Sequence, residues 1–296
     1  MLVKDGEILE ARILRDEVIP AGTVLAARLI STGRNAVARA GDQEYLLPKG
    51  APGVTEGATL NIEVTREALA GGEPWKRPLA RVSDAAPAPA PAIHGRSLPF
   101  PSPSDALEAV GWSDLIDEAR SGIIAFPGGE LRVALTPAMT LIDVDGHLPP
   151  EQLALAGATA SARAIRRHGI SGSIGIDLPT ISGKAARQAV AEAVDAILPQ
   201  PFERTAVNGF GFLQIVRRRR HASLFELAAD RAGFVARALL RRAARETGAI
   251  TLVAHPAVIG ALRPEWLDQL GAQVGGAVAL RPDPSLAMSA AYARST

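Results

Sequence analysis

Residues 139–178 read MTLIDVDGHLPPEQLALAGATASARAIRRHGISGSIGIDL, and their pattern predicts how the middle of the chain is arranged. MTLIDV and SIGIDL are short apolar runs typical of strands. The Ala-rich residues 150–168 between them predict a helix that ends at Gly169. Strands joined by a helix of this length are typical of a βαβ unit with a right-handed crossover. We therefore expect the two strands to be parallel neighbours in one sheet.

Each of these two strands carries an aspartate at its end. Asp143 lies in MTLIDV and Asp177 in SIGIDL, and Asp145 faces the same way as Asp143 if the first strand continues that far. Neighbouring strands lie about 4.8 Å apart, so aspartates at matching ends would share one cation. Carboxylate ligands favour a hard cation, most simply Mg²⁺ with several waters retained. The alternative is that these acids are turn residues or helix caps, and the local pattern leaves both interpretations open.

The chain as a whole has the pattern of a multidomain α+β protein. Residues 1–83 contain short Val-, Ile- and Leu-rich segments broken by Gly, Pro and Asp, which predict a small β-barrel. The Ala- and Pro-rich residues 84–105 predict a semi-rigid linker. Residues 106–227 alternate strands and helices and predict an α/β domain with a mixed sheet. Residues 228–296 predict a small α/β subdomain, and a single long helix is expected over 223–247.

Composition limits the classes of protein to which the chain can belong. With 47% hydrophobic residues the chain can bury one large core or two modest ones. The net charge of +1 gives no global attraction to nucleic acid, so polyanion binding needs a local patch. The absence of cysteine excludes disulfides and cysteine-ligated metals and fits a cytoplasmic location. No segment approaches the roughly 20 apolar residues of a membrane span, so no membrane partner is expected.

Three stretches carry a resemblance to a known family. They are WSDLIDEARSGIIAFPGGELRVALTPAMTLIDVDG, LALAGATASARAIRRHGISGSIGIDLPTI and GFGFLQIVRRRRHASLFE. From residue 112 to 227 the chain resembles the catalytic region of the ribonuclease E/G family. Residues 1–83 resemble its RNA-binding OB-fold domain more loosely, so the resemblance implies an OB-like barrel. The residues after 227 are similar to the family's small C-terminal domain.

The resemblance implies an activity and assigns roles to the aspartates. Members of this family are Mg²⁺-dependent endoribonucleases that cut single-stranded RNA, and Mn²⁺ is the expected substitute ion. Asp143 and Asp177 fall on the family's two metal-binding aspartates, so both are candidate catalytic residues. Asp145 falls where the family usually has an asparagine near the metal, and it is the third candidate. The implied reaction is hydrolysis of a phosphodiester bond by a metal-activated water.

The chain departs from the family in several places. It lacks the cysteine pair that joins protomers through zinc, so neither zinc nor the zinc-linked tetramer is expected. Only the Pro-rich linker occupies the place of the 5′-sensor domain. AGATAS, residues 156–161, replaces the asparagines of the helix after Asp143. These losses support an alternative, an RNA-binding or scaffold protein with weak or no catalysis. The retained aspartates argue for catalysis, because buried like charges are costly unless they are used.

Basic and aromatic residues supply candidate RNA contacts. Four consecutive arginines, residues 217–220, follow the strand GFLQIV, and alternation would place Arg217 and Arg219 on one face. The resemblance implies that such arginines contact RNA phosphates, although a solvated run of charge is the simpler interpretation. An OB-fold binds single strands by stacking bases on aromatics, and residues 1–83 offer only Tyr45 and Trp75, with Lys76 beside them. Tyr45 is equally compatible with a place in the barrel core.

Overall fold

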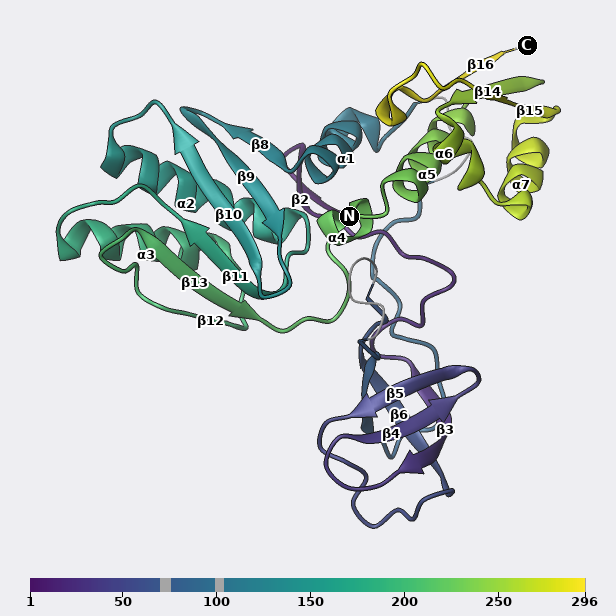
Figure 1. Ribbon diagram of the computed structural model, residues 1–296, viewed down its shortest axis with the longest axis horizontal. Helices are drawn as coiled ribbons and strands as arrows, with labels where there is room; N and C mark the ends of the chain where they lie inside the picture. The colour runs from purple at the N-terminus through teal and green to yellow at the C-terminus, as the bar shows by residue number, and fades with distance from the viewer. Residues whose placement is uncertain (70–75, 99–103, 296) are drawn as a thin grey trace. The chain divides into compact units, whose positions relative to one another are not determined.

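The computed structural model of the 296-residue chain describes residues 1–69, 76–98 and 104–295 (Figure 1). The fold is mixed α+β, with a closed five-stranded barrel near the N-terminus and further mixed sheets with helices, which confirms the predicted class. Contacts divide the chain into two compact units: the first contains residues 1–98 and 105–226, and the second contains Ser104 and the residues from Leu227 onward. No helix in the described residues has the length and apolar character needed to cross a membrane.

The barrel contains five strands in the order β3-β4-β5-β7-β6, and β6 pairs with β3 to close it. Its strands are β3 (Val24–Ser31), β4 (Ala36–Ala40), β5 (Gln43–Leu47), β6 (Thr59–Arg66) and β7 (Leu79–Val82). Alternate side chains such as Leu29, Leu47 and Ile62 point inward and are fully buried. The first residues of the predicted linker extend this barrel, because the backbones of Ala88 and Val24 exchange hydrogen bonds of 2.9 and 3.0 Å.

The first two strands lie outside the barrel, although the predicted barrel domain began at residue 1. β1 (Leu2–Lys4) and β2 (Glu7–Glu10) form a hairpin of their own. This hairpin contacts the end of helix α2 (Pro150–Arg167): Glu10 pairs with Arg166 at 2.8 Å, and the Ala11 N–H donates to the Arg167 carbonyl at 2.9 Å. Strand-forming patterns alone do not reveal which sheet a strand joins.

A six-stranded mixed sheet forms the centre of the first unit, in the order β12-β13-β11-β10-β9-β8. The strands are β8 (Ile123–Phe126), β9 (Gly129–Leu135), β10 (Thr140–Gly146), β11 (Gly172–Asp177), β12 (Phe202–Arg204) and β13 (Phe212–Arg217). The associated helices are η1 (Glu108–Val110), α1 (Trp112–Ser121), α2 and α3 (Lys184–Ile197). β10 and β11 are parallel neighbours joined through α2, as predicted, whereas β9 and β13 run antiparallel to them.

Helices α2 and α3 lie on the same face of this sheet (Figure 1). Ile142, Val144, Ile174 and Ile176 point toward the helices and belong to the main core, which also contains the small buried alanines of α2. Gly157 permits the closest approach, because a Cβ built on it would lie 2.3 Å from Cγ1 of Val144. The small residues of α2 therefore allow this helix to lie directly against β10.

The second unit contains a three-stranded sheet, in the order β15-β14-β16, and its own core. Its elements are α5 (Arg231–Ala243), β14 (Ile250–Ala254), α6 (Pro256–Gly260), α7 (Pro264–Val274), β15 (Val278–Pro282), η2 (Met288–Ala290) and β16 (Tyr292–Ser295). The single helix expected over 223–247 is wrong. α4 (Leu224–Ala228) ends early, and α5 begins afresh after Asp230, whose Oδ1 accepts the Gly233 N–H at 3.1 Å and caps the new helix.

Candidate functional site

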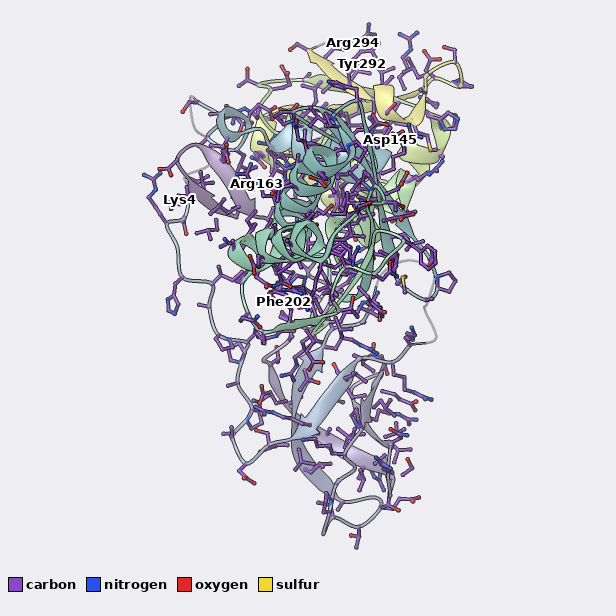
Figure 2. All side chains as sticks on the ribbon, turned by 90° about the vertical axis from the view of Figure 1, so that its left-hand side faces the viewer. Lys4, Asp145, Arg163, Phe202, Tyr292 and Arg294 are labelled. Carbon is purple, nitrogen blue, oxygen red and sulfur yellow. The ribbon has the colours of Figure 1, made fainter. Side chains whose placement is uncertain are left out.

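Asp143 and Asp177 are direct partners across the parallel β10–β11 pair. The register also pairs Ile142 with Ile176, so neither strand is shifted relative to the other. Because the flanking isoleucines point into the core beneath the helices, alternation sends both aspartates to the opposite face. We call Asp143 and Asp177 the carboxylate pair, and the sheet face that bears them the open face. Asp145, farther along β10, lies on the side of the sheet opposite Arg163 of α2 (Figure 2).

The carboxylate pair is exposed to solvent, and so is Asp145. The argument that buried like charges must be retained for a purpose therefore does not apply to these residues. Exposed carboxylates at neighbouring positions cost little while water screens them. Their exposure instead leaves the pair accessible to a cation and to a large ligand from the same side.

Asp145 differs from the carboxylate pair in its surroundings. It is the partner of Glu130 across the β9–β10 pair, and one strand repeat of roughly 7 Å separates it from Asp143. Its Oδ1 accepts the backbone N–H of Gly146 at 2.8 Å, as expected for an acid at a strand end. In the part of the chain that the structure describes, no three His, Asp or Glu side chains lie close enough to hold a metal together. The structure thus brings two of the three predicted acids together.

Arg132 is a functional candidate that sequence reasoning missed. It lies on β9 directly opposite Asp143, and its Nε donates to Oε1 of Glu130 at 2.8 Å. The hydrogen bond and charge of Glu130, followed by the charges of Asp145 and Asp143, raise the pKa of Arg132 above its ordinary value, so it remains a cation. The tight turn from Thr136 to Met139 was the available signal, because counting outward from it pairs Arg132 with Asp143.

The arginines predicted to contact RNA lie elsewhere. Arg217 pairs with Gly172 at the opposite end of β11 from Asp177, about 17 Å along the strand. Its NH1 donates to the Ile170 carbonyl at 3.0 Å, and desolvation lowers its pKa from the ordinary arginine value. Arg219 forms an ion pair with Glu226. Both side chains have internal partners, and contact of these arginines with RNA phosphates stays a prediction.

The predicted RNA contacts in the barrel are also revised. Tyr45 is only 1% exposed and lies in the barrel core, where desolvation raises its pKa. Stacking on a nucleobase is therefore incompatible with its position. Lys76 is half-buried, and Trp75 lies outside the described residues. Nearby, Glu44 holds both Arg39 and Arg77, so part of the barrel's positive charge is neutralised internally.

A separate groove of about 750 Å³ lies among α1, α2 and the β1–β2 hairpin. Its apolar lining includes Ile8, Leu115 and Leu155, and the ion pair between Arg167 and Glu118 borders it. None of the predicted site residues lines this groove. The groove is thus distinct from the carboxylate pair, and the candidate chemistry belongs to the open face.

The donor set of the carboxylate pair fits a magnesium ion. Mg²⁺ is commonly held by one or two carboxylates, with waters and substrate phosphate oxygens completing its coordination. Two exposed aspartates in register on neighbouring strands provide those ligands from a rigid sheet, whereas zinc sites in proteins typically include histidine or cysteine ligands. No family model and no curated protein matches the chain.

Proposed function

We propose that the chain is a metal-dependent endoribonuclease that hydrolyses phosphodiester bonds of single-stranded RNA at the carboxylate pair. The observation that carries the proposal is the direct register of Asp143 with Asp177 on the open face. The preference for RNA over DNA rests on the resemblance of residues 112–227 to the ribonuclease E/G family. The mechanism below is what this arrangement of side chains would perform.

Asp143 and Asp177 would hold Mg²⁺ between two neighbouring strands. When bound, the ion supplies an activated water and neutralises charge on the phosphate. The rigid β10–β11 pair keeps the two carboxylates in place, so little conformational entropy is lost when they bind the ion. Their exposure admits a long polymer without a lid.

Arg132 would orient the RNA beside the carboxylate pair. Its guanidinium remains charged and has N–H donors beyond those of Nε and Nη2, which lie 2.8 and 2.7 Å from Oε1 of Glu130. It is therefore suited to a phosphate oxygen of the substrate. Such a contact stabilises the charge that develops on the phosphate in the transition state. Asp145 would assist from the end of β10 without joining the pair directly.

One observation favours the alternative of an RNA-binding or scaffold protein without effective catalysis. The donor set is limited to two carboxylates, and Arg132 opposite Asp143 repels a cation approaching the same face. In that case the open face would hold RNA without cutting it. The two functions differ in whether metal-dependent cleavage occurs.

The test is a single-turnover cleavage assay on a labelled, unstructured RNA with Mg²⁺ and with EDTA. Asp143→Asn and Asp177→Asn should each slow cleavage about 100-fold or more, because each removes a metal ligand worth several kcal/mol. Asp117→Asn, at an exposed aspartate of α1, is the matched control and should cut normally. Asp145→Asn should have a smaller effect. Binding of Mn²⁺, followed by electron paramagnetic resonance, gives a readout independent of cleavage.

Two results would contradict the nuclease proposal. Cleavage that persists at the wild-type rate in Asp177→Asn would exclude the carboxylate pair as its source. RNA binding without cleavage, equal in the wild type and Asp143→Asn, would favour the scaffold function.

A further inference from the structure

A row of side chains crosses the open face at the level of the carboxylate pair. The register pairs Arg132 with Asp143, Asp143 with Asp177, and Asp177 with Phe212. The row therefore runs from a cation, through two acids, to an aromatic ring on β13. Three strand spacings give it a length of roughly 14 Å. An extended ligand lying along it would cross the strands rather than follow them.

The aromatic end of the row continues into a tight turn that presents Phe210. Phe210 is 85% exposed, the highest value among the exposed large hydrophobic residues of the described chain. Asn208 holds the turn, because its Oδ1 accepts the N–H groups of Phe210 and Phe212 at 2.9 and 3.0 Å. The Leu178 N–H donates to the Gly211 carbonyl at 3.1 Å and ties the turn to the residue after Asp177. Phe210 is thus exposed on an ordered support.

An apolar platform lies on the open face one strand repeat, roughly 7 Å, before the carboxylate pair, on the side away from this turn. It consists of Met139, Leu141 and Phe212, which converge over Gly175 of β11. A Cβ built on Gly175 would lie 2.5 Å from Cζ of Phe212 and 3.0 Å from both Leu141 Cδ2 and Met139 Sδ. The absence of a side chain at Gly175 therefore allows the tip of the Phe212 ring to reach over β11, two residues before Asp177.

We propose that Phe210 and the platform form a nucleobase-stacking subsite, which holds a base next to the phosphate presented to the carboxylate pair. The inference rests on the proposed function, because the ligand is the single-stranded RNA on which that function acts. Aromatic faces bind bases of any identity, so the subsite positions the strand without selecting a sequence. It also supplies the aromatic contact for which the buried Tyr45 is unsuited.

Charge favours RNA over a second copy of the chain as the occupant of this face. Association of two copies would desolvate Asp143, Asp177 and Arg132, and taking such charges out of water is costly. An RNA strand presents phosphates to Arg132 and a bound cation, and it presents planar bases to the apolar end of the same row. One ligand class therefore satisfies both ends.

The test measures binding of the full chain to an unstructured RNA of about 12 nucleotides by fluorescence anisotropy, with Ca²⁺ replacing Mg²⁺. Phe210→Ala should weaken binding roughly 5- to 150-fold, the range for loss of one stacked base. Phe210→Trp should retain affinity, and its added indole emission should be quenched by RNA but not by an abasic strand of equal length. Val216→Ala, on the same face of β13 but about 13 Å from the row, is the matched control and should bind normally.

Several outcomes would overturn the subsite. Phe210→Ala with wild-type affinity, or an equal loss for RNA and the abasic strand, would exclude base stacking. A change from dimer to monomer on sedimentation, with RNA affinity unchanged, would assign the face to contact between copies. The nuclease proposal is tested separately. If RNA quenches the indole emission of Phe210→Trp but the wild-type protein does not cleave RNA, the stacking subsite is supported and the nuclease activity is excluded.

Discussion

Arg132 and Asp143 face each other across the antiparallel β9–β10 pair, so a permanent cation lies beside one member of the carboxylate pair. The arrangement predicts opposite effects on metal binding and on cleavage. Arg132→Gln removes a positive charge beside the carboxylate pair, so Mn²⁺ should bind up to about 5-fold more tightly. Cleavage should nevertheless slow about 10-fold or more, because the phosphate loses a charged donor. Titration with Mn²⁺ and single-turnover kinetics measure the two effects. Weaker metal binding in this variant would contradict the proposed geometry.

Gly157→Ala should destabilise the protein, although alanine is normally preferred to glycine within a helix. In an open helix, Gly→Ala stabilises by about 1 kcal/mol. Here the new methyl would meet the stiff, β-branched Val144 at 2.3 Å, and overpacking of this kind costs about 1–3 kcal/mol. We expect Gly157→Ala to lower the free energy of unfolding, as measured by urea denaturation. Adding Val144→Ala should restore part of the loss, whereas additive losses would argue against a direct clash.

His221 predicts a dependence of stability on pH. Burial is the main cause of its lowered pKa. The charges of Arg12 and Arg220 also lower it, whereas the hydrogen bond with the Ala222 carbonyl and the charge of Glu67 raise it. The folded protein therefore keeps His221 neutral where the unfolded chain, with a pKa near 6.5, takes up a proton. The stability contribution is complete above that value and declines as pH falls through it toward the lowered folded pKa.

The measurement is denaturant unfolding between about pH 8 and about pH 5.5, where the unfolded histidine titrates. His221→Gln should show a smaller loss of stability across that interval than the wild type. Identical pH profiles for the two proteins would show that His221 does not contribute.

Substitutions at Tyr45 should change the stability of the protein without changing its affinity for RNA through a direct contact. Tyr45→Phe keeps the ring and should leave RNA affinity unchanged, because the hydroxyl and ring are buried in the barrel core. Tyr45→Ala should lower the free energy of unfolding by about 3–5 kcal/mol through the cavity that it creates. Thermal denaturation and anisotropy binding test the two statements. A selective loss of RNA binding in Tyr45→Phe would return this residue to the RNA-binding surface.

The sequence predicted the relations that depend on local order. Strand, helix and strand over residues 139–178 predicted the parallel β10–β11 pair, and matching positions in the two strands predicted that Asp143 and Asp177 would meet. Both inferences need only the period of each element and the handedness of the connection. The small barrel was predicted from turn spacing for the same reason.

Relations that depend on non-local register were missed. Alternation shows that Arg217 lies on one of the two faces of the sheet. That this face is opposite to that of the aspartates follows from Leu213 and Ile215, which point the same way as Arg217 and lie in the core. Arg132 enters the site through an antiparallel neighbour whose register is set by the Thr136–Met139 turn. The break between α4 and α5 depends on the capping side chain of Asp230, in a stretch whose composition favours a continuous helix.

Arg167 contacts the chain both before and after the barrel segment in the sequence. Its carbonyl accepts the N–H of Ala11, which precedes the barrel in the sequence. Its guanidinium binds Glu118, which follows the barrel, at 2.8 Å. Within that segment, the hydrogen bonds between Val24 and Ala88 bring the barrel's entry and exit together. The barrel is therefore an insertion into the sheet domain, and its folding shortens the loop that must close before the N-terminal hairpin can dock. Unfolding of the barrel lengthens that loop, at about 0.6 kcal/mol for each doubling, so a distant domain contributes to the stability of a hairpin through chain entropy.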